Sequence, residues 1–239
     1  MILKHACSLA AAAMALVSMA AAQAPPPQER VAALKESLAK NQAALKQYSW
    51  VETTVISMKG EVKKQQQKQC AYGPDGKVQK TPIGEQEPKG KEPSEGGRRG
   101  GRAKQAVVAK KVGEVKDYME DVAALVHQYV PPDAQKIQAV QGAGNLAVQP
   151  GAGVTVLNLK DYLKPGDLLA IGFDPAAKAM RSYSVSSYVE KPEDDAVNMA
   201  VTFGSLADGT SYPQQIVLDV KAKNIQVKVT NAGHKKAGT

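Results

Sequence analysis

The last third of the chain is a series of short β-rich runs separated by turn residues, and this pattern most constrains the fold. Six runs of apolar and β-branched residues are interrupted by Pro-Gly-Asp, Asp-Pro, Lys-Pro, Ala-Asp-Gly and Lys-Asn. Turns this short join antiparallel strands, because a parallel connection needs a dozen or more residues. The pattern predicts six strands of one antiparallel sheet: 154–159, 168–173, 180–189, 196–203, 214–220 and 225–230.

One face of this sheet needs a cover, because apolar residues alternate along its strands. Val197, Met199, Val201 and Phe203 share one face of a single predicted strand. Two segments with helical apolar spacing, 28–47 and 103–130, are the obvious covers. The apolar seam of the second consists of Val108, Val112, Val115, Met119, Val122 and Val126. We therefore predict an α+β fold: a curved antiparallel β-sheet (half-barrel) covered on one face by amphipathic helices.

The segment between the two predicted helices is expected to add a polar hairpin and a loop. Residues 48–58 alternate as a strand does, and 61–72 is a polar partner suited to a sheet edge. Pro74-Asp75-Gly76 predicts a further turn. Residues 81–102 have no periodicity and many Gly, Pro and charged residues, so we expect a disordered basic insertion there. A short helix is predicted over 133–140, after an Asp cap.

The N-terminus has the features of a bacterial secretory signal peptide. Residues 1–22 contain a short positive head, an Ala-rich apolar run and a small-residue cleavage site. We expect this leader to be removed and residues 23–239 to form a single domain in the periplasm or the medium. No later segment is long and apolar enough to span a bilayer, so the chain is not expected to be transmembrane.

The positive charge of the chain is concentrated in one stretch. Residues 59–111 contain 14 Lys and Arg against six Asp and Glu, an excess of eight that equals the formal net charge of the whole chain. Arg98, Arg99 and Arg102 are candidates for contact with an anionic membrane surface or an envelope protein. A solvated loop without a specific partner is the alternative. We expect no nucleic-acid partner, because the leader directs export and no aromatic residues interleave the basic ones.

The sequence contains no recognisable catalytic, metal or cofactor motif. His127 and His234 are the two histidines after the leader, and neither belongs to a nucleophile motif or a metal-ligand spacing. His234 lies in a Lys-rich tail that we expect to fray, and His127 is expected to be a partly buried helix residue. Cys70 is the one cysteine after the leader, and we favour a buried, inert thiol. We therefore predict no enzyme activity, no cofactor and no metal; an enzyme with an unrecognised site is the weakest alternative.

The order of the predicted elements resembles the periplasmic lipoprotein-carrier (LolA-like) superfamily. The likeness rests on a strand that opens with Tyr48-Ser49-Trp50, an Asp174-Pro175 turn, and Asp208-Gly209-Thr210-Ser211-Tyr212-Pro213 leading into Gln215-Ile216-Val217-Leu218. The 81–102 insertion and the polar early hairpin depart from that pattern. Members of the superfamily hold an acyl chain or a lipidated peptide between a half-closed sheet and its helices.

The resemblance implies an apolar cavity and a non-enzymatic function. The expected cavity wall consists of Trp50, Met119, Val197, Met199, Val201 and Phe203. We expect a periplasmic binding or carrier protein for a lipid acyl chain or a lipoprotein. The alternative is an interaction or sensor module that uses the same fold to bind an envelope protein.

Overall fold

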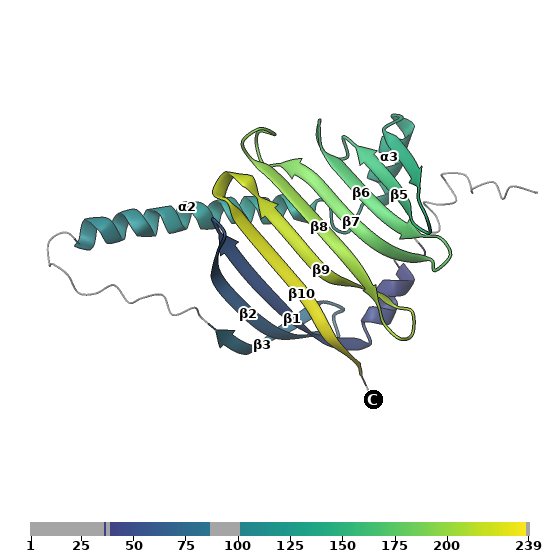
Figure 1. Ribbon diagram of the computed structural model, residues 1–239, viewed down its shortest axis with the longest axis horizontal. Helices are drawn as coiled ribbons and strands as arrows, with labels where there is room; N and C mark the ends of the chain where they lie inside the picture. The colour runs from purple at the N-terminus through teal and green to yellow at the C-terminus, as the bar shows by residue number, and fades with distance from the viewer. Residues whose placement is uncertain (1–35, 37–38, 87–100, 238–239) are drawn as a thin grey trace, which may run out of the picture.

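The computed structural model describes residues 36, 39–86 and 101–237, with the backbone alone described at 84–86 and 101–109 (Figure 1). Ten strands form one open antiparallel sheet in the order β3-β2-β1-β10-β9-β8-β7-β6-β5-β4. The predicted antiparallel sheet is therefore confirmed. The strands are β1 (Tyr48–Met58), β2 (Glu61–Tyr72), β3 (Val78–Gln86), β4 (Leu146–Pro150), β5 (Thr155–Lys160), β6 (Leu168–Asp174), β7 (Ala179–Tyr188), β8 (Ala196–Ser205), β9 (Ser211–Val220) and β10 (Ile225–Lys236).

Short hairpins connect most neighbouring strands, as the turn residues predict. Lys59 and Gly60 join β1 to β2 and both have positive φ, 54° and 80°. Two residues in this conformation match the right-handed twist of the strands they join. The chain end returns to the middle of the sheet, because β10 pairs with β1 as well as with β9.

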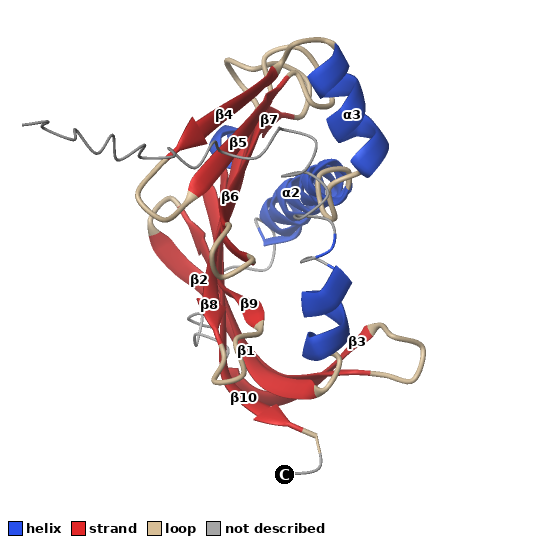
Figure 2. Cartoon of the chain, turned by 90° about the vertical axis from the view of Figure 1, so that its right-hand side faces the viewer, coloured by secondary structure: helices blue, strands red, loops and turns tan. Residues whose placement is uncertain are grey.

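The helices lie on the concave face of the sheet. Figure 2 shows α2 (Gly101–His127) seen along its axis beside that face, α3 (Ala134–Gly142) beyond β5, and a short helical stretch, residues 39–45, near β10. A 3-10 turn, η1 (Lys221–Lys223), lies between β9 and β10. The sheet dominates the fold, and the helices cover its concave face only in part. Within the described residues, no helix combines the length and apolarity of a membrane span.

The hydrophobic core lies between the helices and the strands from β5 to β8. Val122, Leu125 and Tyr129 of α2 and Ile137 and Val140 of α3 are buried in it. Their partners on the sheet are buried side chains of alternate residues: Leu157, Leu159, Leu169, Ile171, Phe173, Tyr183, Val185, Val197, Met199 and Val201. Alternation along the strands thus produces one continuous apolar face, as the sequence predicts.

The predicted seam of α2 is correct only over its C-terminal part. Val122 is fully buried, and Val115, Met119 and Val126 pack half-buried against the core, but Val112 is 63% exposed. The reason is geometric: the N-terminal half of α2 runs past the end of the sheet (Figure 1). Val108 lies among the residues whose side chains are not described.

Three other segments differ from the sequence prediction. Residues 81–86 belong to β3, and α2 begins at Gly101, so both ends of the predicted 81–102 insertion are regular structure; 87–100 lie outside the described residues. β4 was not predicted, because it is a five-residue edge strand without a buried side chain. β10 continues to Lys236, so the tail that carries His234 is a strand and does not fray into a coil. The expected leader, 1–22, lies outside the described residues.

Candidate ligand-binding face

Strand register places a mixed apolar and charged surface on the concave face of β1, β2 and β3. Ile56 packs against the core, which assigns its side of β1 to the concave face. Trp50, Glu52 and Thr54 lie on the same side, because successive side chains of a strand alternate. Their partners across β2 are Cys70, Lys68 and Gln66, and Ile56 is opposite Lys64.

The centre of the predicted cavity wall is filled by the protein's own side chains. Val197, Met199 and Val201 are 1%, 6% and 8% exposed and belong to one core cluster with Val122 and Leu125. The structure thus packs this part of the wall directly against α2. Met119 and Phe203 lie at the border of the cluster and are half-buried.

Next to this filled region, the concave face carries apolar side chains that are only half covered. We call them the half-buried strip: Ile56, Met58, Ile216, Leu218 and Val227. All five pack against the core cluster on one side. They come from β1, β9 and β10, three strands that are neighbours in the sheet. The strip is therefore contiguous, and the alternation of Thr54, Ile56 and Met58 is the sequence signal that could have located it.

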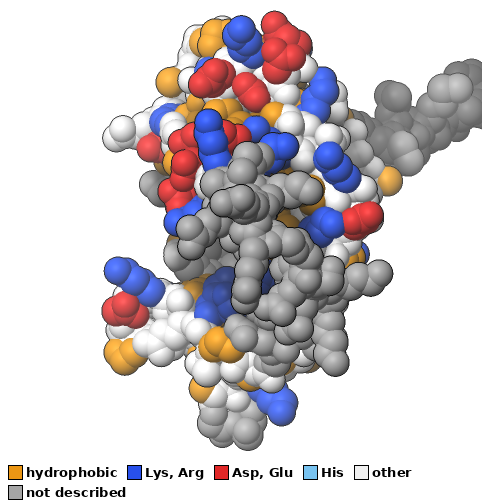
Figure 3. Space-filling view, turned by 90° about the vertical axis from the view of Figure 1, so that its left-hand side faces the viewer, with side chains coloured by type: hydrophobic (Ala, Val, Ile, Leu, Met, Phe, Trp, Pro, Cys, Tyr) orange, Lys and Arg blue, Asp and Glu red, His pale blue; other side chains and the backbone are white. Residues whose placement is uncertain are grey.

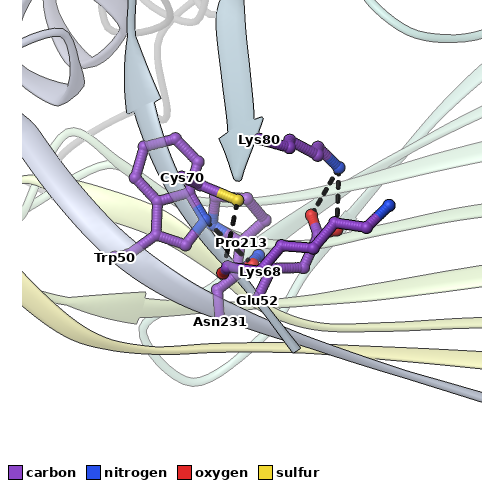
Figure 4. Close-up of polar contacts among 7 residues, drawn as sticks. All are labelled: Trp50, Glu52, Lys68, Cys70, Lys80, Pro213 and Asn231. Carbon is purple, nitrogen blue, oxygen red and sulfur yellow. Dashed lines mark hydrogen bonds and ion pairs between the residues drawn. The ribbon is translucent and has the colours of Figure 1, made fainter. Parts of the chain in front are cut away.

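Trp50, the remaining residue of the predicted wall, lies near the N-terminal end of β1 and is held there by polar contacts (Figure 4). Its indole Nε1 donates to Asn231 Oδ1 at 3.1 Å, and Asn231 Nδ2 donates to the Pro213 carbonyl at 2.7 Å. Trp50 is 9% exposed. A buried indole needs such a partner for its N–H, and this one ties β1 to β10 and β9.

Beside Trp50, a carboxylate and an ammonium form an ion pair on the same face (Figure 4). Lys80 Nζ lies 2.8 Å and 2.6 Å from the two Glu52 oxygens. The Glu52 side chain is 11% exposed, whereas that of Lys80 is 43% exposed. A buried carboxylate must be paired, so Lys80 neutralises the charge that β1 places here.

Cys70 is buried within this group, as predicted. It is 0% exposed, and its Sγ lies 3.8 Å from the Lys68 carbonyl oxygen. Burial raises the pKa of the Cys70 thiol, with a smaller upward effect of the Glu52 charge. The protonated form is therefore favoured, which suits an unreactive thiol.

His234 occupies an ordered aromatic cluster, which corrects the expectation of a frayed tail. Its ring stacks on Trp50 at 5.9 Å with an interplanar angle of 13°, and lies 4.0 Å from the Tyr212 ring. Burial lowers the pKa of His234 below its ordinary value. His127 is exposed at the end of α2, so the predicted partial burial was wrong.

A second buried polar group joins the end of α2 to the β5–β6 connection. Asp167 is 2% exposed and accepts from the Tyr129 hydroxyl at 2.5 Å. It also accepts the backbone N–H groups of Tyr162, Leu163 and Lys164. Ser187 Oγ lies 2.8 Å from the Tyr129 hydroxyl oxygen and donates to it, because the one hydroxyl proton of Tyr129 goes to Asp167. Four hydrogen bonds thus hold this carboxylate, three of them from backbone N–H groups, which indicates a structural function.

Three cavities of the described region have no residue of the half-buried strip in their lining. One of about 440 Å³ is lined by turn and strand-end residues, among them Lys59, Asn198, Asp219 and Asn224. Another, of about 340 Å³, lies between residues 36–44 and the 208–210 turn. A third, of about 250 Å³, is lined by residues of β6, β7, β8 and β9.

The face of the molecule shown in Figure 3 carries mixed charges over its described part. In Figure 3, Lys and Arg side chains are interspersed with Asp and Glu over the visible described part. Arg98 and Arg99, two of the expected anionic-surface contacts, lie outside the described residues; Arg102 lies in α2, but its side chain is not described. No group of three potential metal ligands occurs among the residues that the structure describes.

Comparison with known proteins gives no family for this chain. No family model matches the sequence, and no curated protein matches it. The function must therefore be inferred from the geometry of the concave face.

Proposed function

We propose that the chain is an exported, non-enzymatic binding or carrier protein that holds an acyl chain on its concave face. The observation that carries this proposal is the half-buried strip. Its side chains remain partly exposed beside core residues such as Val197 and Met199, which are 1% and 6% exposed.

The energetic argument is that the strip retains burial energy for a ligand. Each methylene removed from water contributes about 0.8 kcal/mol. Half-buried side chains still expose apolar surface that a ligand can remove from water, whereas Val197 and Met199 are already buried in the free protein. An acyl chain laid over Ile56, Val227 and Leu218 would complete their burial.

The neighbouring helix supplies adaptable contacts for such a ligand. Met119 and Val115 of α2 pack half-buried against the same core cluster. Met has three rotatable bonds and a polarisable sulfur, so it can repack against chains of different shape. Because the N-terminal half of α2 runs past the end of the sheet (Figure 1), the helix contacts the core through its C-terminal half, which contains Val115 and Met119.

The proposal is tested by substitution on the two faces of one strand. Ile56→Gln places an amide in the strip, and we expect it to weaken binding of a fluorescent long-chain fatty acid about tenfold, because it removes one large apolar contact. Affinity is measured by fluorescence titration of detergent-free protein.

Val55→Gln is the matched control. Val55 is also half-buried but lies on the opposite face of β1, opposite Gln65 and Lys228. It should leave affinity within twofold, with circular dichroism showing that both variants fold. Equal affinities of the two variants, or no binding by the unmodified protein, would count against an acyl-chain site on this face.

A further inference from the structure

One register row of the sheet places a lysine at the end of the half-buried strip. Ile56 is opposite Lys64 on β2 and opposite Val227 on β10. Val227 is opposite Leu218 on β9, and Leu218 is opposite Met199 on β8. The concave face therefore carries an ammonium group, then three half-buried apolar residues, then a buried one, in a single line across the strands.

The dimensions of this row suit an extended chain with a charged head. Neighbouring strands are about 4.8 Å apart, so the three steps from β2 to β9 span about 14 Å. The row begins at an exposed residue, Lys64, and ends at Met199, which is 6% exposed. A ligand along it would keep its head in water and bury its tail.

The charge at the open end of the row is positive. Lys68, which is half-buried, lies on the same face as Lys64, two side chains further along β2. Glu52, the carboxylate opposite Lys68, is already bound through both oxygens by Lys80. Among the residues that the structure describes, neither Lys64 nor Lys68 belongs to any of the ion pairs.

We propose that the ligand is a single-chain fatty acid whose carboxylate binds Lys64 and Lys68 while its chain lies along Ile56, Val227 and Leu218. This inference rests on the proposed function and specifies its ligand. The Glu52–Lys80 pair shows the same chemistry within the fold, since it holds a carboxylate against a lysine on this face. Two lysines attract either a carboxylate or a phosphate; the Glu52–Lys80 pair favours the carboxylate, and a lysophospholipid of the same chain tests the phosphate.

The test compares one acyl chain with and without its negative charge. The probes are a fluorescent long-chain fatty acid and its methyl ester, titrated into the full chain at low ionic strength. The variant Lys64→Gln/Lys68→Gln should bind the acid about tenfold more weakly and the ester with unchanged affinity, because only the acid carries the charge that the lysines attract. The loss should shrink at 1 M salt, where the Debye length is about 3 Å.

Lys228→Gln is the matched control, because Lys228 is exposed on the opposite face of β10, beside Val55. It should leave both affinities unchanged. The inference is overturned if the double variant binds both the acid and the ester with the affinities of the unmodified protein, or if Lys228→Gln lowers the affinity for the acid as much as the double variant does. It is also overturned if binding of a lysophospholipid with the same chain depends on the two lysines while binding of the acid does not. Failure of the unmodified protein to bind either probe would instead remove the proposed function itself.

Discussion

Individual residues hold this fold through buried polar groups, and Asp167 is the clearest case. Its carboxylate accepts from three backbone N–H groups and from the Tyr129 hydroxyl. Removing either the carboxylate or its hydrogen-bond donors lowers the free energy of unfolding by several kcal/mol, because water cannot reach the buried groups that are left unpaired. Asp167 therefore matters more to stability than its position in a connecting segment suggests.

Asp167→Asn should lower the free energy of unfolding by about 2–4 kcal/mol. The amide brings an N–H group toward backbone N–H groups that need an acceptor, and it lacks the charge that strengthens those bonds. Urea unfolding followed by circular dichroism measures the change. Asp194→Asn, at an exposed position, should stay within 0.5 kcal/mol of the unmodified protein; similar values for both variants would contradict the structural function of Asp167.

His234 should make stability depend on pH near neutrality. Its folded pKa is lowered by burial, so below an unfolded pKa of about 6.5 the unfolded chain binds more protons than the folded one. Stability should therefore fall as pH drops from 7.5 to 5.5. Asp208, whose pKa the hydrogen bond from Tyr48 lowers to about 2, remains charged throughout this window and contributes no slope.

His234→Phe preserves an aromatic ring between Trp50 and Tyr212 but removes the titrating group. Urea midpoints measured at several pH values should give a smaller slope for this variant. An unchanged slope between pH 7.5 and 5.5 would show that other groups produce the dependence.

Single elements show where sequence patterns predict structure well and where they do not. The alternation of Val197, Met199, Val201 and Phe203 predicts both strand β8 and its inner face, because the first three of these side chains are buried and the fourth is half-buried. The periodicity of α2 predicts a helix but not its contact length: Val112 fits the seam by spacing and yet lies beyond the sheet. Spacing records which residues share a face, and only the tertiary arrangement decides how much of that face is covered.

The two ends of α2 should therefore respond differently to the same substitution. Val122→Ala should cost about 1–3 kcal/mol, since Val122 is 0% exposed in the core. Val112→Ala, at 63% exposure, should change stability by less than 0.5 kcal/mol. Both are measured by urea unfolding. A loss of more than about 1 kcal/mol in the free energy of unfolding for Val112→Ala would contradict the exposure of this end of the helix.

Long-range contacts explain what the sequence could not predict of the candidate site. Lys64, Ile56, Val227 and Leu218 come from four strands, and β10 returns from the end of the chain to pair with β1. No local pattern reveals that pairing, so the row of register partners is invisible until the topology is known. The wall residues predicted from β8 lie on the concave face in its filled part, because burial by α2 is also a tertiary property.

At the scale of the whole molecule, the open sheet leaves one concave face to serve two purposes. The strands from β5 to β8 use it for the core, whereas β1, β9 and β10 keep apolar side chains half covered. We propose that an acyl chain lies where these two parts of the concave face meet.

Methyl NMR of the protein titrated with a long-chain fatty acid tests directly whether the acyl chain lies on this part of the concave face. We expect chemical-shift changes at the methyl groups of Ile56, Leu218 and Val227, and none at Val55 and Val217, which lie on the opposite face of the sheet. Chemical-shift changes confined to the opposite face, or spread equally over both faces, would contradict binding of the acyl chain on the concave face.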